Sequence, residues 1–361
     1  MNESASVRQR AVELEDQKIQ KEDSTLNHAL QSRTPVVAET FPGIFWCPDL
    51  VSTRDLGPQG VEAVLHLADL MKARPSVFQR SLAGRQMVMF FEKPSLRTRL
   101  TFESGMTSLG GTAMFVDQSQ GRLDARETLS DIAHNLERWV DVIVLRTFAQ
   151  ETIENMARHA SVPVINALSD VEHPCQALAD YFTLQERFGD LKDICLAYVG
   201  DGNNVAHSLL LTCACVGSSL RIATPKDYGP NAKIVADARK LAKQTGAHIE
   251  LLTDPHAAVA GVDAVYTDAW ASMGQEQEAD LRAGIFPPYQ VNQQLMSEAA
   301  PHAVFMHCLP AHRGEEVTDE VMDSEQSIIF EQAENRLHVQ KSILYLLLGG
   351  GVRLPVRSAH A

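Results

Sequence analysis

Short apolar segments recur along the chain at intervals that predict a largely parallel β-structure. From Gln86 onward they are rich in Val, Ile and aromatic residues, as strands buried on both faces of a parallel sheet are. The first half of the chain contains MVMFF, TAMFV, VIVLRT and VPVINAL. The second half contains ICLAYVG, LRIAT, HIELLT, AVYTD, AVFMH and SIIFE. Each of these segments is predicted to be a strand.

The segments between these strands carry apolar residues at helical spacing. The clearest helical faces comprise Phe102, Met106 and Leu109 in one segment, and Ile132, Leu136 and Trp139 in another. Alternation of strands and helices predicts an α/β protein with right-handed crossovers. We expect two doubly wound domains, each a mainly parallel sheet flanked by helices. A long helix, residues 333–348, follows the last predicted strand and is expected to pack back on the first domain.

The predicted elements divide the chain into four parts. Residues 1–40 form a polar extension without the apolar core of a secretory signal. The helix-like segment HPCQALADYFTLQERFGD separates the two groups of strands. We therefore predict a first domain at 41–185, a second at 186–332, and a C-terminal segment at 333–361. A chain of 361 residues is long enough for two such domains.

Composition and charge narrow the function classes. The formal net charge is −14, which argues against a nucleic-acid or anionic-membrane surface. No apolar run reaches the length of about 18 residues that a membrane span requires. None of the six cysteines forms a CxxC pair, and Cys195, Cys213 and Cys215 lie in apolar runs. We expect buried free thiols in a reduced, cytoplasmic protein.

A cluster of cations and hydroxyls follows the first predicted strand, in FFEKPSLRTRLTFE. Pro94 should end the strand, and Ser95 is well placed to cap a helix that begins near Leu96. Arg97 and Thr98 would then lie in the first helical turn. Cations are unfavourable at that end of a helix dipole unless an anion binds there. The pattern therefore predicts a phosphate site, although a capped surface helix with unpaired arginines is the simpler alternative.

Polar residues also follow two other strands of the first half. Arg146 ends VIVLRT, and His173 and Gln176 follow VPVINAL. Ligands of open α/β sheets bind beyond the carboxyl ends of the strands. We expect these side chains to share one crevice with Ser95, although a solvated arginine or a capping histidine would explain each residue alone.

In the second half, GDGNNVAHS follows a strand but departs from a dinucleotide-binding loop. Val205 occupies the third glycine position, and no acid follows the next strand to hold a ribose hydroxyl. The loop could instead present Asn203 and Asn204 to a carboxylate. Asp268, in YTDAWASMGQE, is a candidate partner for an ammonium group or, alternatively, a helix cap.

The motif MHCLPAHRGEE leaves two further chemistries open. His307 and Cys308 are adjacent, and a cysteine hydrolase needs a thiol and an imidazole within hydrogen-bond reach. Histidine and cysteine could also bind metal, but no spacing matches a zinc pattern. Arg336, near the start of the last helix, is another anion-binding candidate or an ordinary surface arginine.

Taken in order, these motifs resemble the aspartate/ornithine transcarbamylase family, and most closely its ornithine carbamoyltransferases. The resemblance extends from about residue 41 to 350. The motifs that carry it are FEKPSLRTR, LRTF, HPCQ, GDGNNVAHS, DAWASMG, HCLPAHRGEEV and AENRLHVQK. It implies transfer of a carbamoyl group from carbamoyl phosphate to the δ-amine of L-ornithine, giving L-citrulline and phosphate, as in arginine biosynthesis. It implies no cofactor and no metal, and a homotrimer or a multiple of one.

The resemblance also implies roles for individual residues. The expected catalytic residues are Arg146, His173, Asp268, Cys308 and Arg336. The expected carbamoyl-phosphate site comprises Ser95, Leu96, Arg97, Thr98, Gln120, Arg146, His173, Pro174, Cys175, Gln176, Cys308, Leu309 and Arg336. The expected ornithine site comprises Asn204, Asp268, Ser272 and Met273. In the family, the glutamine that Gln120 matches reaches across from a neighbouring subunit.

Two features of the sequence bear on which amine accepts the carbamoyl group. An aspartate-using relative would need cations in the second domain, whereas DAWASMG carries an acid, which favours a cationic acceptor. Leu96 departs from the Thr that ornithine enzymes usually have. Relatives that use N-acylated ornithines also carry an apolar residue there, so they remain the alternative, together with a non-catalytic ligand-binding protein of the same fold.

Overall fold

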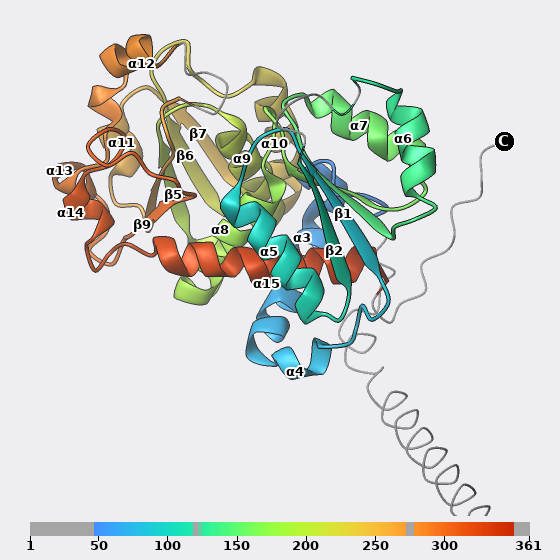
Figure 1. The fold of residues 1–361 in the computed structure, drawn as a ribbon. Coiled ribbons are helices and arrows are strands. Elements are labelled where there is room, and N and C mark those ends of the chain that lie inside the picture. Colours follow the sequence, from blue (N-terminus) through green and yellow to red (C-terminus); the bar gives the residue numbers. More distant parts are fainter. Residues whose placement is uncertain (1–46, 118–122, 124, 272–277, 350–361) are drawn as a thin grey trace, which may run out of the picture. The chain divides into compact units, whose positions relative to one another are not determined.

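The computed structural model describes residues 47–117, 123, 125–271 and 278–349. Two separate parallel sheets organise this part of the chain (Figure 1). The first sheet has the order β2-β1-β3-β4. Its strands are β1 (Gln86–Phe91), β2 (Thr112–Asp117), β3 (Val142–Arg146) and β4 (Val164–Leu168). The second sheet has the order β7-β6-β5-β8-β9. Its strands are β5 (Cys195–Val199), β6 (Ser219–Ala223), β7 (His248–Leu252), β8 (Ala264–Thr267) and β9 (Val304–His307).

Helices cover both sheets, so the predicted fold class is confirmed. Those between Thr53 and Phe188 are α3 (Thr53–Ala73), α4 (Pro75–Phe78), α5 (Leu96–Ser108), α6 (Leu129–Leu136), α7 (Gln150–His159) and α8 (Pro174–Phe188). Those further along the chain are α9 (Asn204–Val216), α10 (Ala232–Thr245), α11 (Pro255–Val259), α12 (Ala279–Ile285), α13 (Gln293–Met296), α14 (Asp319–Met322) and α15 (Ile329–Leu347). Single turns of 3₁₀-helix lie at Leu191–Asp193 and Pro287–Tyr289. None of the helices in the described ranges is long and apolar enough to cross a membrane.

Each sheet has its own apolar core. Ile132 of α6 and Met156 of α7 pack with Ile143 of the first sheet. Val259 of α11 and Leu295 of α13 pack in a second cluster that includes strand residues of the second sheet. This burial, rather than helix propensity, holds such short helices in place.

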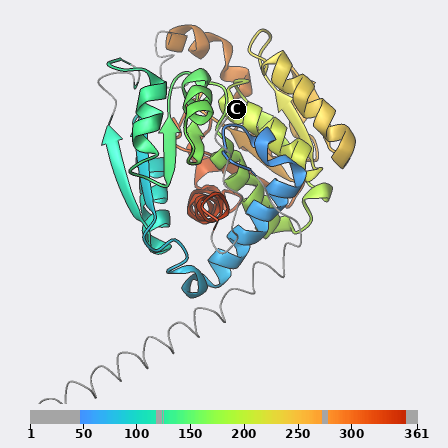
Figure 2. The ribbon, with the colours of Figure 1, turned by 90° about the vertical axis from the view of Figure 1, so that its right-hand side faces the viewer.

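The C-terminal helix α15 returns to the first sheet as predicted. It packs against α3, α5 and α8, and its inward residues include Val339 and Ile343. Figure 2 views α15 nearly end-on, with the strands of the first sheet on one side and α3 on the other. Because α15 begins beside β9, it carries Arg336 from the second sheet toward α5.

Two sequence expectations were wrong. SIIFE is not a strand: Ser327 makes only an isolated bridge to Phe305, and α15 begins at Ile329. A short apolar run cannot by itself distinguish a strand from the first turn of a buried helix. Trp139 does not share a buried face with Ile132, because α6 ends at Leu136 and the indole is 64% exposed.

All six cysteines are free thiols, as expected. Cys213 and Cys215 are buried, whereas Cys195 is partly exposed at the start of β5.

Candidate functional site

The predicted phosphate site lies where β1 passes into α5. Ser95 is the N-cap of α5, and its hydroxyl accepts a hydrogen bond from the backbone N–H of Thr98. The Thr98 side chain is buried and accepts from Ser95 Oγ at 2.9 Å. A capped helix N-terminus without an acidic residue in its first turn is free to receive an external anion.

The cations of this segment have different environments. Lys93 is buried in an ion pair with Asp170 and lies over the Phe148 ring. Arg99 pairs with Glu103 one turn along the helix. Arg97 forms no salt bridge with a carboxylate in the described part of the chain. No described carboxylate pairs with the half-buried helix terminus beside it either. Leu96 is 71% exposed and contributes no polar contact.

Two buried arginines face this helix terminus from different elements. Arg146 comes from the end of β3, and Arg336 from α15. Arg336 Nη2 donates to Thr98 Oγ1 at 2.7 Å. Neither guanidinium forms a salt bridge with a described carboxylate, and the Nε atoms of both are buried without a hydrogen-bond partner there. Such uncompensated buried cations indicate a site for an anion.

The electrostatics support this interpretation. Burial, and next the repulsion of Arg336, lower the pKa of Arg146 to about 9. Burial also lowers the pKa of Arg336. The ring of His173, at the start of α8, is buried, and this burial together with both arginines holds its pKa well below the ordinary range. His173 is therefore neutral at physiological pH, with one ring N–H to donate.

A buried amide network adjoins the arginines. Gln176 Nε2 donates to Asp180 Oδ1 at 2.8 Å, and Gln332 Nε2 donates to the same oxygen at 2.7 Å. Gln332 Oε1 in turn accepts from the backbone N–H of His307. Gln176 Oε1 is left without a partner among the described residues. The network therefore fixes the Gln176 amide with its carbonyl oxygen free to accept from a ligand.

Pro174 and Cys175 open the first turn of α8. The Cys175 thiol donates to the carbonyl oxygen of Asn166 at 3.5 Å, and burial raises its pKa to about 12. Its side chain is thus an inert part of the core, and only the backbone of this turn is available to a ligand.

Asp268 lies beyond the carboxyl end of β8 in a fixed orientation. One carboxylate oxygen accepts from Asn203 Nδ2 at 2.8 Å. The other accepts from the backbone N–H of Ala269 at 2.8 Å and from the Cys308 thiol at 3.0 Å. Asn203 also caps α9 through its side-chain oxygen. This carboxylate is therefore pre-oriented, as an ammonium site requires, and does not cap a helix.

Asn204 lies between the two sheet regions. Its side-chain Nδ2 donates to the backbone oxygen of Ser169 at 2.6 Å. Four residues further along α9, Ser208 Oγ accepts from the backbone N–H of His173 at 2.8 Å. An amide nitrogen carries two hydrogens, so Asn204 retains one donor for a carboxylate.

The loop after β9 holds Cys308 and Leu309. Leu309 adopts a positive φ of 58°, and its backbone N–H donates to His307 Nδ1 at 2.9 Å. Non-glycine residues in this backbone region cost about 1–3 kcal/mol and are concentrated at ligand sites. Burial, and next the charge of Asp268, raise the pKa of the Cys308 thiol well above its ordinary value.

These contacts bear on the alternative chemistries. His307 uses Nδ1 as an acceptor and its Nε2 lies 3.1 Å from Glu316, so neither ring nitrogen is available as a base for Cys308. Possible metal-ligand atoms of Asp268, His307 and Cys308 lie within 4.8 Å of one another. Because both ring nitrogens of His307 already have partners, the imidazole is not available to bind a metal there. Gly202 lies so close to the backbone of residues 228–230 that a Cβ would clash at 2.3 Å, so packing explains this glycine without a nucleotide.

Three predicted site residues, Gln120, Ser272 and Met273, lie outside the described residues. Arg282 lies just beyond the gap at residues 272–277. It donates to the backbone oxygen of Trp270 at 2.6 Å and pairs with Asp201 at 2.9 Å and Glu278 at 3.1 Å. One buried guanidinium thus joins residues on both sides of the gap to the GDGNNVAHS loop.

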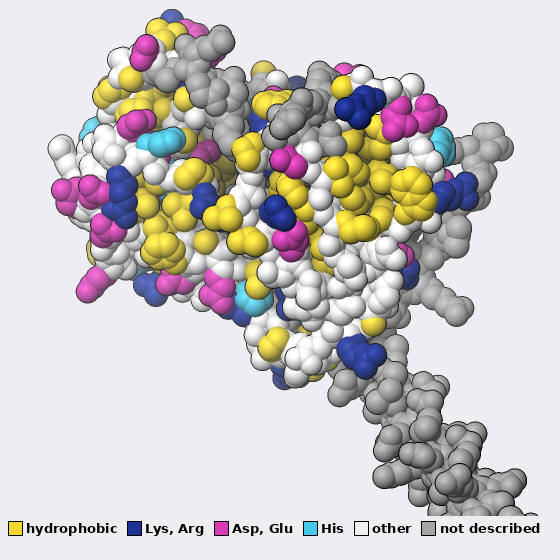
Figure 3. All heavy atoms as spheres, viewed as in Figure 1, with side chains coloured by type: hydrophobic (Ala, Val, Ile, Leu, Met, Phe, Trp, Pro, Cys, Tyr) yellow, Lys and Arg dark blue, Asp and Glu magenta, His cyan; other side chains and the backbone are white. Residues whose placement is uncertain are grey.

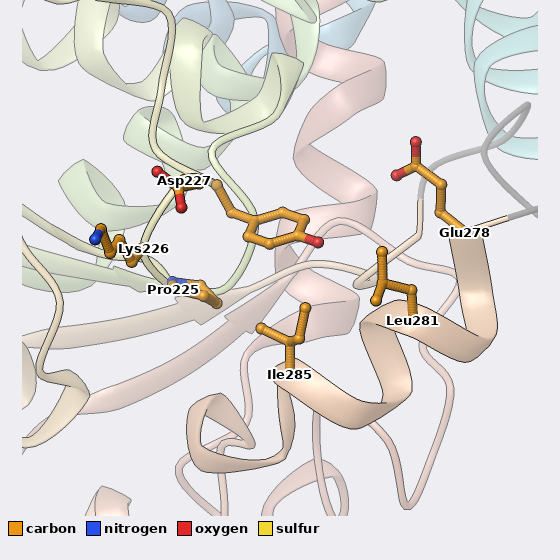
Figure 4. A pocket seen from close by; sticks show the side chains of 7 residues that line it. Pro225, Lys226, Asp227, Glu278, Leu281 and Ile285 are labelled. Atoms are coloured by element: carbon orange, nitrogen blue, oxygen red, sulfur yellow. The ribbon is translucent and has the colours of Figure 1, made fainter.

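A pocket of about 630 Å³ lies elsewhere on the second sheet region, between the loop after β6 and α12 (Figure 4). It is lined by Pro225, Lys226, Asp227, Tyr228, Glu278, Leu281 and Ile285. None of these is a predicted site residue. The lining of this pocket lacks the convergent buried cations that lie between β3 and α15. We therefore place the candidate site between β3 and α15 and not at this pocket.

The sequence matches the two domain profiles of one family. "Aspartate/ornithine carbamoyltransferase, carbamoyl-P binding domain" matches residues 48–186, and "Aspartate/ornithine carbamoyltransferase, Asp/Orn binding domain" matches residues 192–347. The chain belongs to the aspartate/ornithine carbamoyltransferase family.

Relatives in this carbamoyltransferase family are similar over nearly their whole length. The ornithine carbamoyltransferase of Pyrococcus abyssi is 48% identical over 304 residues, which are 84% of this chain and 96% of the relative. That of Hyperthermus butylicus is 49% identical over 85% of this chain and 99% of the relative. The solved ornithine carbamoyltransferase of Pyrococcus furiosus superimposes with a TM-score of 0.81 at 47% identity, covering 84% of this chain and 98% of that one.

Sequence reasoning missed several residues that shape the site. Asp180 and Gln332 carry the amide network, and Asn203 orients Asp268. Asp180 gave one signal: it is an acid at a four-residue spacing from Gln176 within the otherwise apolar ALADYF. Gln332 gave none, because its partners lie far away in sequence.

Proposed function

We propose that this protein is an ornithine carbamoyltransferase that acts in arginine biosynthesis. It transfers the carbamoyl group of carbamoyl phosphate to the δ-amine of L-ornithine, giving L-citrulline and phosphate. The observation that carries the proposal is a pair of buried arginines, Arg146 and Arg336, beside the capped N-terminus of α5, neither of which forms a salt bridge with a described carboxylate. Family membership gives the anion expected there a chemical identity.

The phosphate would bind at the start of α5. Ser95, Leu96, Arg97 and Thr98 would surround it with backbone N–H groups, hydroxyls and the Arg97 charge, and the helix dipole would favour its negative charge. Arg336 already contacts Thr98 and is within reach of the same anion.

The carbamoyl group would bind between Arg146, His173 and Gln176. The neutral His173 ring would donate to the carbonyl oxygen, and Arg146 would bridge this oxygen and the phosphate. Gln176 Oε1 is the buried acceptor that the carbamoyl NH₂ needs. The backbone of Cys308 and Leu309 and the first turn of α8, with Pro174 and Cys175, would complete the site. Gln120 would reach this site from a neighbouring subunit.

Ornithine would bind beyond β8. Asp268 would bind its amino groups, and the remaining N–H of Asn204 would bind its α-carboxylate. We propose that Ser272 and Met273 close over the substrate. Cys308 would act as a neutral thiol that keeps Asp268 in place, consistent with its raised pKa.

The reaction follows from this arrangement. The neutral δ-amine attacks the carbonyl carbon, and a C–N bond forms while the carbonyl oxygen gains negative charge. That oxygen then reforms the double bond, the C–O bond to phosphate breaks, and the proton lost by the nitrogen leaves with the departing phosphate. His173 and Arg146 stabilise the oxyanion, and Arg97, Arg336 and the helix terminus stabilise the departing phosphate. Holding both substrates together supplies much of the remaining rate.

The proposal extends to organisation and location. We assign carbamoyl-phosphate binding to residues 41–185 and ornithine binding to 186–332, with 333–361 returning to the first domain.

We propose a cytoplasmic homotrimer or a multiple of one. β2 is an edge strand, its Met114 is partly exposed, and hydrophobic side chains gather over β1 and β2 in Figure 3. Light scattering should give three times the chain mass of 39.7 kDa, or a multiple of that value.

The activity is tested by citrulline formation from carbamoyl phosphate and L-ornithine. Since only the neutral δ-amine attacks, the rate should rise with pH. Release of phosphate without citrulline would contradict the proposal. A non-catalytic binding protein would bind both substrates and form no product.

A further inference from the structure

We propose that His312, Glu315 and Glu316 form a binding site for one divalent transition-metal ion such as Zn²⁺. These residues lie in the loop between β9 and α14. One ligand atom from each, an imidazole nitrogen and two carboxylate oxygens, lies within 4.8 Å of the others. Imidazole and carboxylate together are common ligands of zinc. The site is separate from the proposed catalytic groups.

The environment of Glu316 indicates a missing ligand. Its side chain is fully buried. Oε1 accepts two hydrogen bonds, from the backbone N–H of His312 at 2.6 Å and from His307 Nε2 at 3.1 Å. Oε2 is equally buried but has no hydrogen-bond partner within the described ranges. A buried carboxylate oxygen without a partner is costly, and a cation would satisfy it.

The spacing of the ligand atoms fits a metal better than a hydrogen bond. His312 Nδ1 lies 3.6 Å from Glu316 Oε2, which is longer than an N–H···O hydrogen bond. Two ligands held about 2.1 Å from one ion at a tetrahedral angle are about 3.4 Å apart. His312 and Glu315 are exposed, so an ion can enter from solvent.

The surrounding loop is fixed and its nearest cation is engaged elsewhere. Gln290 Nε2 donates to the backbone oxygens of Gly314 and Glu315, at 3.0 and 2.7 Å. Arg313 points to two other acids, Asp319 and Asp323, each at 2.7 Å. No lysine or arginine in the described part of the chain forms a salt bridge with Glu315 or Glu316.

The test uses the full-length protein stripped with a chelator and titrated with Zn²⁺ by calorimetry and with Co²⁺ by visible absorption. We expect one equivalent that persists in Cys308→Ser, with a cobalt spectrum free of thiolate charge-transfer bands. His312→Gln should weaken its binding at least ten-fold. Glu315→Gln should weaken it less. Both replaced side chains are exposed, which preserves folding.

His302→Gln is the matched control, because His302 is also an exposed histidine beside an acid, Asp263. It should bind metal as the wild type does. Absence of any bound equivalent would overturn the proposal. So would binding that survives both His312→Gln and Glu315→Gln, or that disappears in Cys308→Ser.

Discussion

Replacing Arg336 with Met should distinguish the residue's contribution to anion binding from its contribution to the stability of the fold. Arg336 is buried, and its one hydrogen bond in the described structure is the donation to Thr98 Oγ1. It also faces Arg146 in a low-dielectric environment. If the guanidinium is present for an anion, its loss should weaken anion binding while scarcely affecting the ligand-free protein.

The magnitudes follow from the surroundings of the two arginines. Burial and then Arg336 lower the pKa of Arg146 to about 9, and one pKa unit corresponds to about 1.4 kcal/mol. The charged form of Arg146 is thus disfavoured by on the order of 4–5 kcal/mol, mostly by burial. Removing Arg336 relieves part of this cost but also removes the hydrogen bond to Thr98, worth about 1 kcal/mol. We expect the free energy of unfolding to stay within about 1 kcal/mol of wild type.

Binding should respond much more strongly. A hydrogen bond to a charged group contributes about 1.5–3 kcal/mol, so phosphate and carbamoyl phosphate should bind about 10- to 100-fold more weakly. Calorimetry with inorganic phosphate and urea denaturation measure the two quantities. Arg187→Met, at an exposed position on α8, is the matched control and should change neither. Unaltered phosphate affinity, or a loss of several kcal/mol in stability, would refute the reasoning.

Three further substitutions test other parts of the account. Asp268→Asn should leave carbamoyl-phosphate affinity intact and lower kcat/KM for ornithine about 100-fold or more, since a desolvated charge pair is lost; equal loss of affinity for both ligands in calorimetry would contradict this. Leu96→Thr should strengthen carbamoyl-phosphate binding about ten-fold by adding a hydroxyl at the phosphate; an unchanged KM would show that position 96 does not reach it. Burial raises the pKa of Glu172 to about 7, so this group binds a proton more readily when folded than when unfolded. Its stabilising contribution, up to about 3 kcal/mol of unfolding free energy, is present below about pH 4.5 and is lost by about pH 7. Glu172→Gln should flatten the measured decline in unfolding free energy across this range; a slope equal to that of wild type would show that Glu172 is not the titrating group.

The sequence predicted the features that local pattern determines. Nine of the expected strands are present, because short apolar runs rich in β-branched residues, such as VIVLR, favour strands buried in a parallel sheet. Ser95 was predicted as the cap of α5 because its hydroxyl and the preceding Pro94 act within one turn. The strand prediction for SIIFE was wrong because the first turn of α15 buries its apolar residues equally well.

The rest of the candidate site depends on contacts between distant segments. Lys93 belongs to the cluster of cations that follows the first strand, but it is buried in an ion pair with Asp170. Gln332 and Asp180 meet only because α15 crosses α8. That Glu316 Oε2 has no hydrogen-bond partner among the described residues follows from three-dimensional burial alone. Such features depend on which side chains the fold leaves unsatisfied, and no local pattern reports that.

The acceptor profile of the purified protein tests the central claim most directly. Initial rates of carbamoyl transfer should be compared for L-ornithine, N-acetylornithine, N-succinylornithine and L-aspartate at a fixed carbamoyl-phosphate concentration. We expect citrulline from L-ornithine and negligible product from the other three. Activity with an N-acylated ornithine and none with L-ornithine would contradict it.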